Sequence, residues 1–148
     1  MRLNSFFVLI VDTDPAGSAA WRAAVPLARM DRQVYSVQTS SEAIEYVLKV
    51  RRSPSLSTPG VVMVESNRSK DPLSAIGRWL KCQETLAWVV PIALVDRRAS
   101  EDLSGYYEAG ARSCLHSPEN LDERVAVLSE VRNYWQVLNV WPNPEGHR

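Results

Sequence analysis

Polar side chains that could do chemistry follow the apolar runs of this sequence. Carboxylate and hydroxyl oxygens of this kind can bind Mg²⁺ and take part in phosphoryl transfer. The two cysteines, Cys82 and Cys114, have neither metal-ligand nor CxxC spacing, and the sequence has only two histidines. The candidates are therefore oxygen-bearing side chains: Asp12, Thr13, Asp14, Glu65, Ser66, Asn67, Asp96 and Ser117.

Strands and helices are predicted to alternate along the chain. Apolar runs of strand length occupy 6–11, 33–38, 61–64, 89–95 and 113–116, and helical spacing occupies 19–25, 43–50, 73–86, 103–111 and 121–138. Because parallel strands need crossover connections, this order predicts an α/β fold, a five-stranded parallel sheet sandwiched by five helices in a doubly wound, flavodoxin-like (βα)5 arrangement. In such sheets ligands bind at the carboxyl ends of the strands, where the candidate side chains fall.

Local signals place the helix starts. Asp14, Asp71 and Ser117 each precede a proline, so each is predicted to be an N-cap with proline in the first turn. Thr39 to Glu42 matches a capping box. We expect one domain over 1–141 and a tail over 142–148 that contains two prolines and a glycine.

Composition excludes several classes of protein. The 148 residues carry 17 basic and 17 acidic side chains, so a dedicated nucleic-acid binder is not expected. The N-terminal apolar run, 6–11, is too short for a leader or a membrane span. With two cysteines and no disulfide framework, we expect a cytoplasmic protein without a membrane anchor.

The sequence resembles the receiver domains of bacterial response regulators, the CheY-like family, over about residues 5–138. Its ending is similar to small single-domain regulators that partner phytochrome-like kinases. The resemblance rests on four stretches in the family's order: FVLIVDTDP at 7–15, VVMVESN at 61–67, PIALVD at 91–96, and YEAGA at 107–111 followed by CLHSP at 114–118.

The same resemblance implies a phosphorylation site that is altered at each part. A working receiver holds Mg²⁺ on carboxylates, phosphorylates an Asp, and uses a Lys and a Ser/Thr to read the product. We therefore predict a pseudo-receiver that needs no phosphorylation, metal or cofactor. The equivalents are Glu65 for the phosphoacceptor, Asp12, Thr13 and Asp14 for the acidic cluster, Asp96 and Cys114 for the switch residues, and Ser117 for the lysine.

Several of these residues also have structural interpretations. Glu65 is either a mimic of a phosphorylated Asp or a relic, and Arg97 or Arg98 is the candidate for replacing the missing cation. His116 is expected to be a packing residue. Both cysteines are expected to fill core space as small hydrophobic residues.

The last helix is predicted to carry two apolar stripes. One stripe, which should face the sheet, contains Leu121, Val125, Leu128, Trp135 and Leu138. The second stripe predicts an interface, because contiguous exposed apolar surface usually marks an interaction site, although the chain's own tail could cover it instead. Its members are Val127, Val131 and Tyr134, with Trp141 beyond the helix.

We therefore predict a non-enzymatic protein–protein interaction module of a two-component or phosphorelay signalling system. Its expected partners are a second copy, bound through the last helix, and a sensor histidine kinase or other signalling protein. One alternative is a receiver that a histidine kinase still phosphorylates. A second is a small flavodoxin-like cofactor-binding protein, although no GxGxxG, Walker A or GxSxG motif is present.

Overall fold

The apolar runs form the strands of one parallel sheet. The computed structural model describes residues 6–51, 59–67, 69–83, 89–96 and 103–134. Within these ranges the sheet has the order β2-β1-β3-β4-β5. This arrangement confirms the predicted fold class. The strands are β1 (Phe7–Val11), β2 (Val34–Val37), β3 (Gly60–Glu65), β4 (Val89–Val95) and β5 (Ser113–His116).

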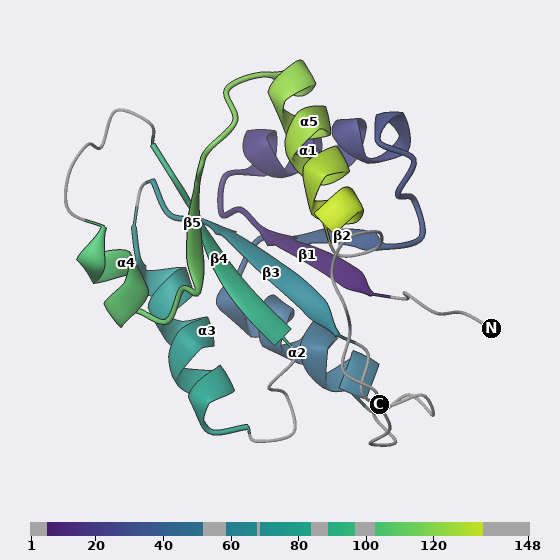
Figure 1. The fold of residues 1–148 in the computed structure, drawn as a ribbon. Coiled ribbons are helices and arrows are strands. Elements are labelled where there is room, and N and C mark those ends of the chain that lie inside the picture. The colour runs from purple at the N-terminus through teal and green to yellow at the C-terminus, as the bar shows by residue number, and fades with distance from the viewer. Residues whose placement is uncertain (1–5, 52–58, 68, 84–88, 97–102, 135–148) are drawn as a thin grey trace.

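Helices cover both faces of this sheet, as Figure 1 shows. Helices α1 and α5 lie on one face, and α2, α3 and α4 lie on the other. None of the helices in the described ranges is long and apolar enough to cross a membrane. The helices are α1 (Pro15–Leu27), α2 (Ser40–Arg51), α3 (Asp71–Lys81), α4 (Ser104–Glu108) and α5 (Leu121–Arg132).

The sheet separates two hydrophobic clusters. Along β1, Val8 and Ile10 pack toward α1 and α5, whereas Leu9 and Val11 pack toward α2 and α3. All five residues of β1 are buried, because a central parallel strand has helices on both faces. The alternation of side chains along a strand therefore decides which helices each residue meets.

Two of the predicted helix caps are confirmed. Asp14 caps α1, and its Oδ1 accepts a hydrogen bond from the Ala16 amide at 3.2 Å. At the start of α2, Thr39 Oγ1 accepts from the Glu42 amide at 3.0 Å. The Glu42 carboxylate accepts in return from the Thr39 amide at 3.3 Å, which completes a capping box.

The other two predicted caps are wrong. Asp71 is the first residue of α3 rather than its cap, and its amide donates to Ser69 Oγ at 3.0 Å. Ser117 lies before the start of α5, whose cap is Asn120 with its Oδ1 accepting from the Glu123 amide at 2.8 Å. A polar residue before proline therefore did not mark the cap in these two cases.

The predicted stripes of the last helix also need correction. Val131 is only 6% exposed and belongs to the core beside Leu128, so it is not the centre of an exposed stripe. Leu121, assigned to the core stripe, is 42% exposed at the first position of α5. Val131 lies three positions after Leu128 and so on the same, buried side of α5. Leu121 is in the first turn of α5, at the end of the helix, where less of the protein covers it. Trp135, Leu138 and Trp141 fall outside the described residues.

Two further packing predictions are wrong. His116 is exposed at the end of β5, because this edge strand has a neighbour on one side only. Cys82 is exposed just after α3, so it does not fill core space. Cys114, in contrast, is half-buried and packs against the cluster on the α4 face, as expected.

Candidate functional site

Strand register brings the first site residues together. Val11 pairs with Val64 across β1 and β3, so the next residues, Asp12 and Glu65, end neighbouring strands. On the far side of β4, the Ser117 amide donates to the Val95 carbonyl at 2.7 Å. Parallel strands thus deliver Asp12, Glu65 and Ser117 to the carboxyl edge of the sheet, as predicted.

The pleat of the strands directs these side chains to one face. Asp12 is two residues after Ile10 and Glu65 is two residues after Met63, and both apolar residues pack on the α1–α5 face. Ser117 follows Leu115 in the same way, and Leu115 packs against that cluster too. Helices α1 and α5 are therefore the elements that close the site.

The central contact is a hydrogen bond between Ser117 and Glu65. Ser117 Oγ lies 2.9 Å from Glu65 Oε1 and 2.7 Å from Oε2. The hydroxyl has a single proton to donate, so it bridges the two carboxylate oxygens rather than binding both at full strength. Ser117 is 8% exposed, so water competes little for this contact.

Burial and the neighbouring charges set the ionisation of Glu65. Its pKa is raised from the ordinary 4.5 to about 7, because burial penalises the charged form. The Ser117 hydrogen bond lowers the pKa, the negative charge of Asp12 raises it, the positive charge of Arg124 lowers it, and Asp96 raises it. The protonated form of Glu65 is thus favoured to a higher pH than that of an exposed glutamate.

Arg124, from the first turns of α5, supplies a positive charge at this site. It lines a 250 Å³ pocket at the carboxyl edge together with Asp12, Glu65 and Ser117. Its guanidinium carbon lies 5.6 Å from the centre of the buried Trp21 ring, a cation–π arrangement that holds the side chain inward. Its Nε is buried without a hydrogen-bond partner. Arg124 therefore acts on Glu65 through its charge.

The acidic loop after β1 is held by its own backbone. Asp12 is 4% exposed, and its Oδ1 accepts from the Asp14 amide at 3.0 Å. Gly17 in α1 lies directly over the Asp12 carboxylate. A Cβ atom, which any other residue would bring to this position, would overlap that carboxylate. Thr13 is exposed and, like Asp14, lines the pocket. The loop therefore presents Asp12 to Glu65 as a second negative charge.

The remaining predicted residues lie around this centre rather than in it. Asp96 follows β4 and acts on Glu65 through its charge. Cys114 projects to the opposite face of the sheet, so it does not join the site. Lys70, in the loop after β3, lies 4.9 Å from the centre of the Tyr106 ring and does not line the pocket. Arg97 and Arg98 lie outside the described residues.

The Glu65 carboxyl group is already engaged by other protein groups. Among the described residues, no group of three or more His, Cys, Asp or Glu side chains has the geometry to hold a metal ion. A carboxylate that is hydrogen-bonded to Ser117 and faces Arg124 has less capacity to bind a divalent cation. The surroundings of Glu65 favour its protonated form more than water does.

Sequence reasoning missed Arg124 and Gly17. A usable signal existed, because the first turn of a helix that follows a strand lies near the carboxyl edge of the sheet. That rule points to residues 121–124, of which Arg124 is the one cation.

Comparison with known proteins gives no match at the level of sequence. No family model matches the chain. No curated protein is significantly similar to it.

Solved structures, by contrast, resemble this fold over nearly its whole length. The response regulator RPA3017 in red light signaling of R. palustris is 18% identical, with a TM-score of 0.68 over 93% of this chain and 99% of that chain. The phosphorylated cyanobacterial phytochrome response regulator RcpA is 17% identical, with a TM-score of 0.65 over 94% and 99%. An atypical orphan response regulator, described as having a phosphorylation-independent regulatory mechanism, is 19% identical, with a TM-score of 0.57 over 88% and 98%.

These comparisons confirm the receiver-like fold that the sequence motifs predicted. The chain has the architecture of response regulator receiver domains, including chemotaxis regulators of the CheY type. At identities below 20% the similarity concerns the fold, and the site has to be judged from its own residues.

Proposed function

We propose that this protein is a pseudo-receiver: a non-catalytic, cytoplasmic interaction module of a two-component or phosphorelay pathway that works without phosphorylation. The observation that carries the proposal is the hydrogen bond from Ser117 to Glu65. It joins the residue at the phosphoacceptor position to the residue at the lysine position. In a working receiver that lysine contacts the phosphoryl group, so here the contact is made without one.

The chemistry of the carboxylate supports the same proposal. Glu65 is one methylene longer than Asp, which displaces its oxygens from an in-line geometry fitted to Asp. Its pKa of about 7 reduces the fraction of nucleophilic carboxylate at neutral pH. The likeness in fold to an atypical orphan response regulator with a phosphorylation-independent mechanism is consistent with this.

Incubation with a small phosphodonor tests the proposal directly. The protein is treated with acetyl phosphate and Mg²⁺, and its intact mass is measured. We expect no gain in mass, with a receiver that retains its Asp and Lys as the positive control. A stoichiometric gain of one phosphoryl group would overturn the proposal, and loss of that gain in Glu65→Gln would assign Glu65 as the acceptor of a working receiver.

The pocket argues against the alternative of a flavodoxin-like cofactor-binding protein. Its volume of 250 Å³ is below the roughly 300–1,000 Å³ of typical cofactor sites. The carboxyl groups of Asp12, Asp14 and Glu65 line it beside one cation, Arg124, so its charge does not favour a phosphate group.

We further propose that a second copy of the chain is a partner, docked on the side formed by α5 and β5. Two residues of the predicted interface lie there: Val127 is half-buried, and Tyr134 is 51% exposed. A two-fold dimer is the commonest soluble assembly. A sensor kinase or another signalling protein is the other partner class that this surface could serve.

A further inference from the structure

The outer edge of β2 presents backbone groups that the sheet does not use. β2 is an end strand in the order β2-β1-β3-β4-β5, and within the described ranges no strand lies beyond it. The carbonyls of Gln33 and Val37 accept from amides of β1 and of the residue after it, at 2.8 and 3.0 Å. Because both backbone groups of a strand residue point the same way and successive residues alternate, Val34 and Ser36 turn theirs outward.

This edge is open to pairing with another strand. The Val34 amide donates to the Met30 carbonyl at 3.2 Å, but no described residue pairs with the Val34 carbonyl or with either backbone group of Ser36. Edge strands are usually protected by a proline, a charged side chain or a bulge. β2 reads VYSV, which has no proline and no charge, and its register with β1 runs without a bulge.

The side chains on the two faces of this edge differ in chemistry. On the α1 face, Ser36 Oγ lies 2.8 Å from Ser18 Oγ, and Arg22 Nη1 donates to Ser18 Oγ at 3.1 Å. These contacts hold the exposed Arg22 side chain near Ser36. On the α2 face, the exposed Tyr35 ring packs against Tyr46, with ring centres 4.8 Å apart. The edge therefore has a cation on one face and an aromatic pair on the other.

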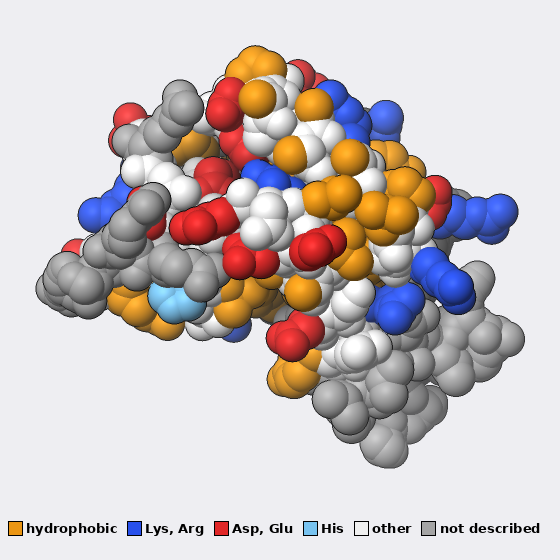
Figure 2. All heavy atoms as spheres, turned by 90° about the horizontal axis from the view of Figure 1, so that it is seen from above, with side chains coloured by type: hydrophobic (Ala, Val, Ile, Leu, Met, Phe, Trp, Pro, Cys, Tyr) orange, Lys and Arg blue, Asp and Glu red, His pale blue; other side chains and the backbone are white. Residues whose placement is uncertain are grey.

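The charge around this edge is mostly positive. Figure 2 shows Lys and Arg side chains gathered toward the right of the face that carries α1 and α5. Figure 1 shows α1 ending and leading into β2 on that same side. The exposed charged residues of α1 and of this connection are Arg22, Arg29, Asp31 and Arg32. Three cations against one carboxylate favour an acidic partner.

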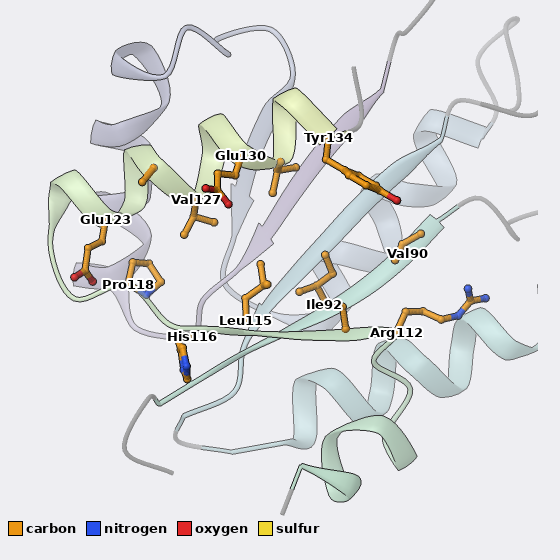
Figure 3. Close-up of a pocket in the computed structure, with 13 residues that line it drawn as sticks. Val90, Ile92, Arg112, Leu115, His116, Pro118, Glu123, Val127, Glu130 and Tyr134 are labelled. Atoms are coloured by element: carbon orange, nitrogen blue, oxygen red, sulfur yellow. The ribbon is translucent and has the colours of Figure 1, made fainter. Parts of the chain in front are cut away.

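The opposite edge of the sheet has no such preference. A groove of about 680 Å³ lies between β5 and α5, and Figure 3 shows the residues that line it. Its charged and titratable lining residues are Arg112, His116, Glu123 and Glu130. Because both signs of charge occur there beside apolar side chains, the groove does not select one class of partner by charge.

We propose that β2 binds an extended segment of a partner protein, which adds to the sheet as a further antiparallel strand and places an acidic side chain opposite Ser36. Directly opposed residues project to the same face, so this side chain meets Arg22. Its two neighbours project to the other face and meet Tyr35 and Tyr46. Backbone hydrogen bonds supply the affinity, and the order apolar–acidic–apolar supplies the specificity. The site depends neither on Glu65 nor on the proposed homodimer.

A synthetic peptide, acetyl-GSTFEFTSG-amide, tests this binding by NMR on the full chain. We expect saturable shifts along β2 and slower hydrogen exchange at the Ser36 amide. The amides of Tyr35 and Val37 turn toward β1, so their exchange should not change. With Gln in place of Glu, the peptide should bind about tenfold more weakly, because a hydrogen bond to a charged group is lost. N-methylation of the Glu amide removes the donor to the Ser36 carbonyl and should abolish binding.

Charge reversal tests the role of Arg22. Arg22→Glu should bind the Glu peptide at least about tenfold more weakly and should gain affinity for the same peptide with Lys in place of Glu. The matched control is Arg112→Glu, on an exposed residue just before β5 at the opposite edge, which should leave both affinities unchanged. Circular dichroism checks that both variants remain folded.

Three results would overturn the proposal. The first is the absence of saturable binding at about 1 mM peptide, or equal binding of the N-methylated peptide. The second is equal affinity of the wild type and Arg22→Glu for the Glu peptide. The third is protection of the Ser36 amide that rises with protein concentration when no peptide is present, because a second copy would then occupy β2.

Discussion

Ser117 and Glu65 are 52 residues apart in the sequence, and a hydrogen bond joins their side chains at 2.7 Å from Oγ to Oε2. This contact ties the connection between β5 and α5 to the end of β3 across the intervening strand β4. Because Arg124 from α5 faces the same carboxyl group, the charge state of Glu65 is coupled to the position of α5.

Replacing Glu65 by Gln should stabilise the protein above neutral pH. The folded-state pKa of Glu65 is about 7, above the ordinary 4.5, so the folded protein keeps a proton that the unfolded chain releases between these values. The stabilising effect of this proton is fully present below about pH 4.5 and is lost as the pH rises through 7. At pH 8 we expect Glu65→Gln to raise the free energy of unfolding by roughly 1 to 2 kcal/mol.

The same variant should have a clearly smaller effect at pH 5, because the folded protein still holds the Glu65 proton there and the unfolded chain, with a pKa near 4.5, has released it only in part. Urea unfolding at both pH values measures the difference, and Glu108→Gln, on an exposed residue of α4, is the matched control. An effect of equal size at pH 5 and pH 8 would show that packing, and not ionisation, is responsible.

Removing the charge of Arg124 should raise the pKa of Glu65 above its value of about 7. The positive charge lowers this pKa by stabilising the carboxylate, so Arg124→Gln removes that stabilisation, whereas Arg124→Lys keeps the charge. Carbon-detected NMR of the Glu65 carboxyl group between pH 5 and 9 follows the titration. If Glu65 has the same pKa in both variants as in the wild type, Arg124 does not act on Glu65 through its charge.

Magnesium should bind weakly. Mg²⁺ requires near-octahedral oxygen ligands, and here Thr13 follows Asp12 where a second carboxylate is expected, while the Glu65 carboxyl group is already hydrogen-bonded to Ser117. We expect a dissociation constant weaker than about 10 mM. Amide NMR shifts during a Mg²⁺ titration measure it, and saturation near 1 mM at Asp12 and Asp14 would contradict this prediction.

Val131→Glu should unfold the protein rather than separate a dimer. Val131 is 6% exposed in the core, so the variant buries an unpaired carboxylate and should cost about 3 kcal/mol or more of folding free energy. Leu121→Glu, on a residue that is 42% exposed, should change stability by less than about 0.5 kcal/mol. Urea midpoints compare the two. If the two variants had equal urea midpoints and Val131→Glu alone changed the sedimentation of the protein, Val131 would belong to an interface and not to the core.

The sequence by itself determined the fold class and the edge of the sheet where the site lies. Five apolar runs separated by helical patterns allow few arrangements other than a parallel doubly wound sheet, because parallel strands need crossover helices. The alternation of side chains also places Asp12, Glu65 and Ser117 on one face. These features depend on local periodicity, which is readable from the chain.

Only the tertiary structure decided which side chains meet. Ser117 before Pro118 matches the local pattern of a helix cap, yet its hydroxyl donates a hydrogen bond to Glu65. The sheet order makes this contact possible, because only β4 separates β5 from β3. Arg124 was not predicted, because its place depends on how α5 packs against Trp21 of α1. Val131 was misassigned because two apolar stripes on one helix look alike until the packing of α5 on the sheet selects the buried one. Contacts between distant segments depend on packing, and local sequence patterns do not encode it.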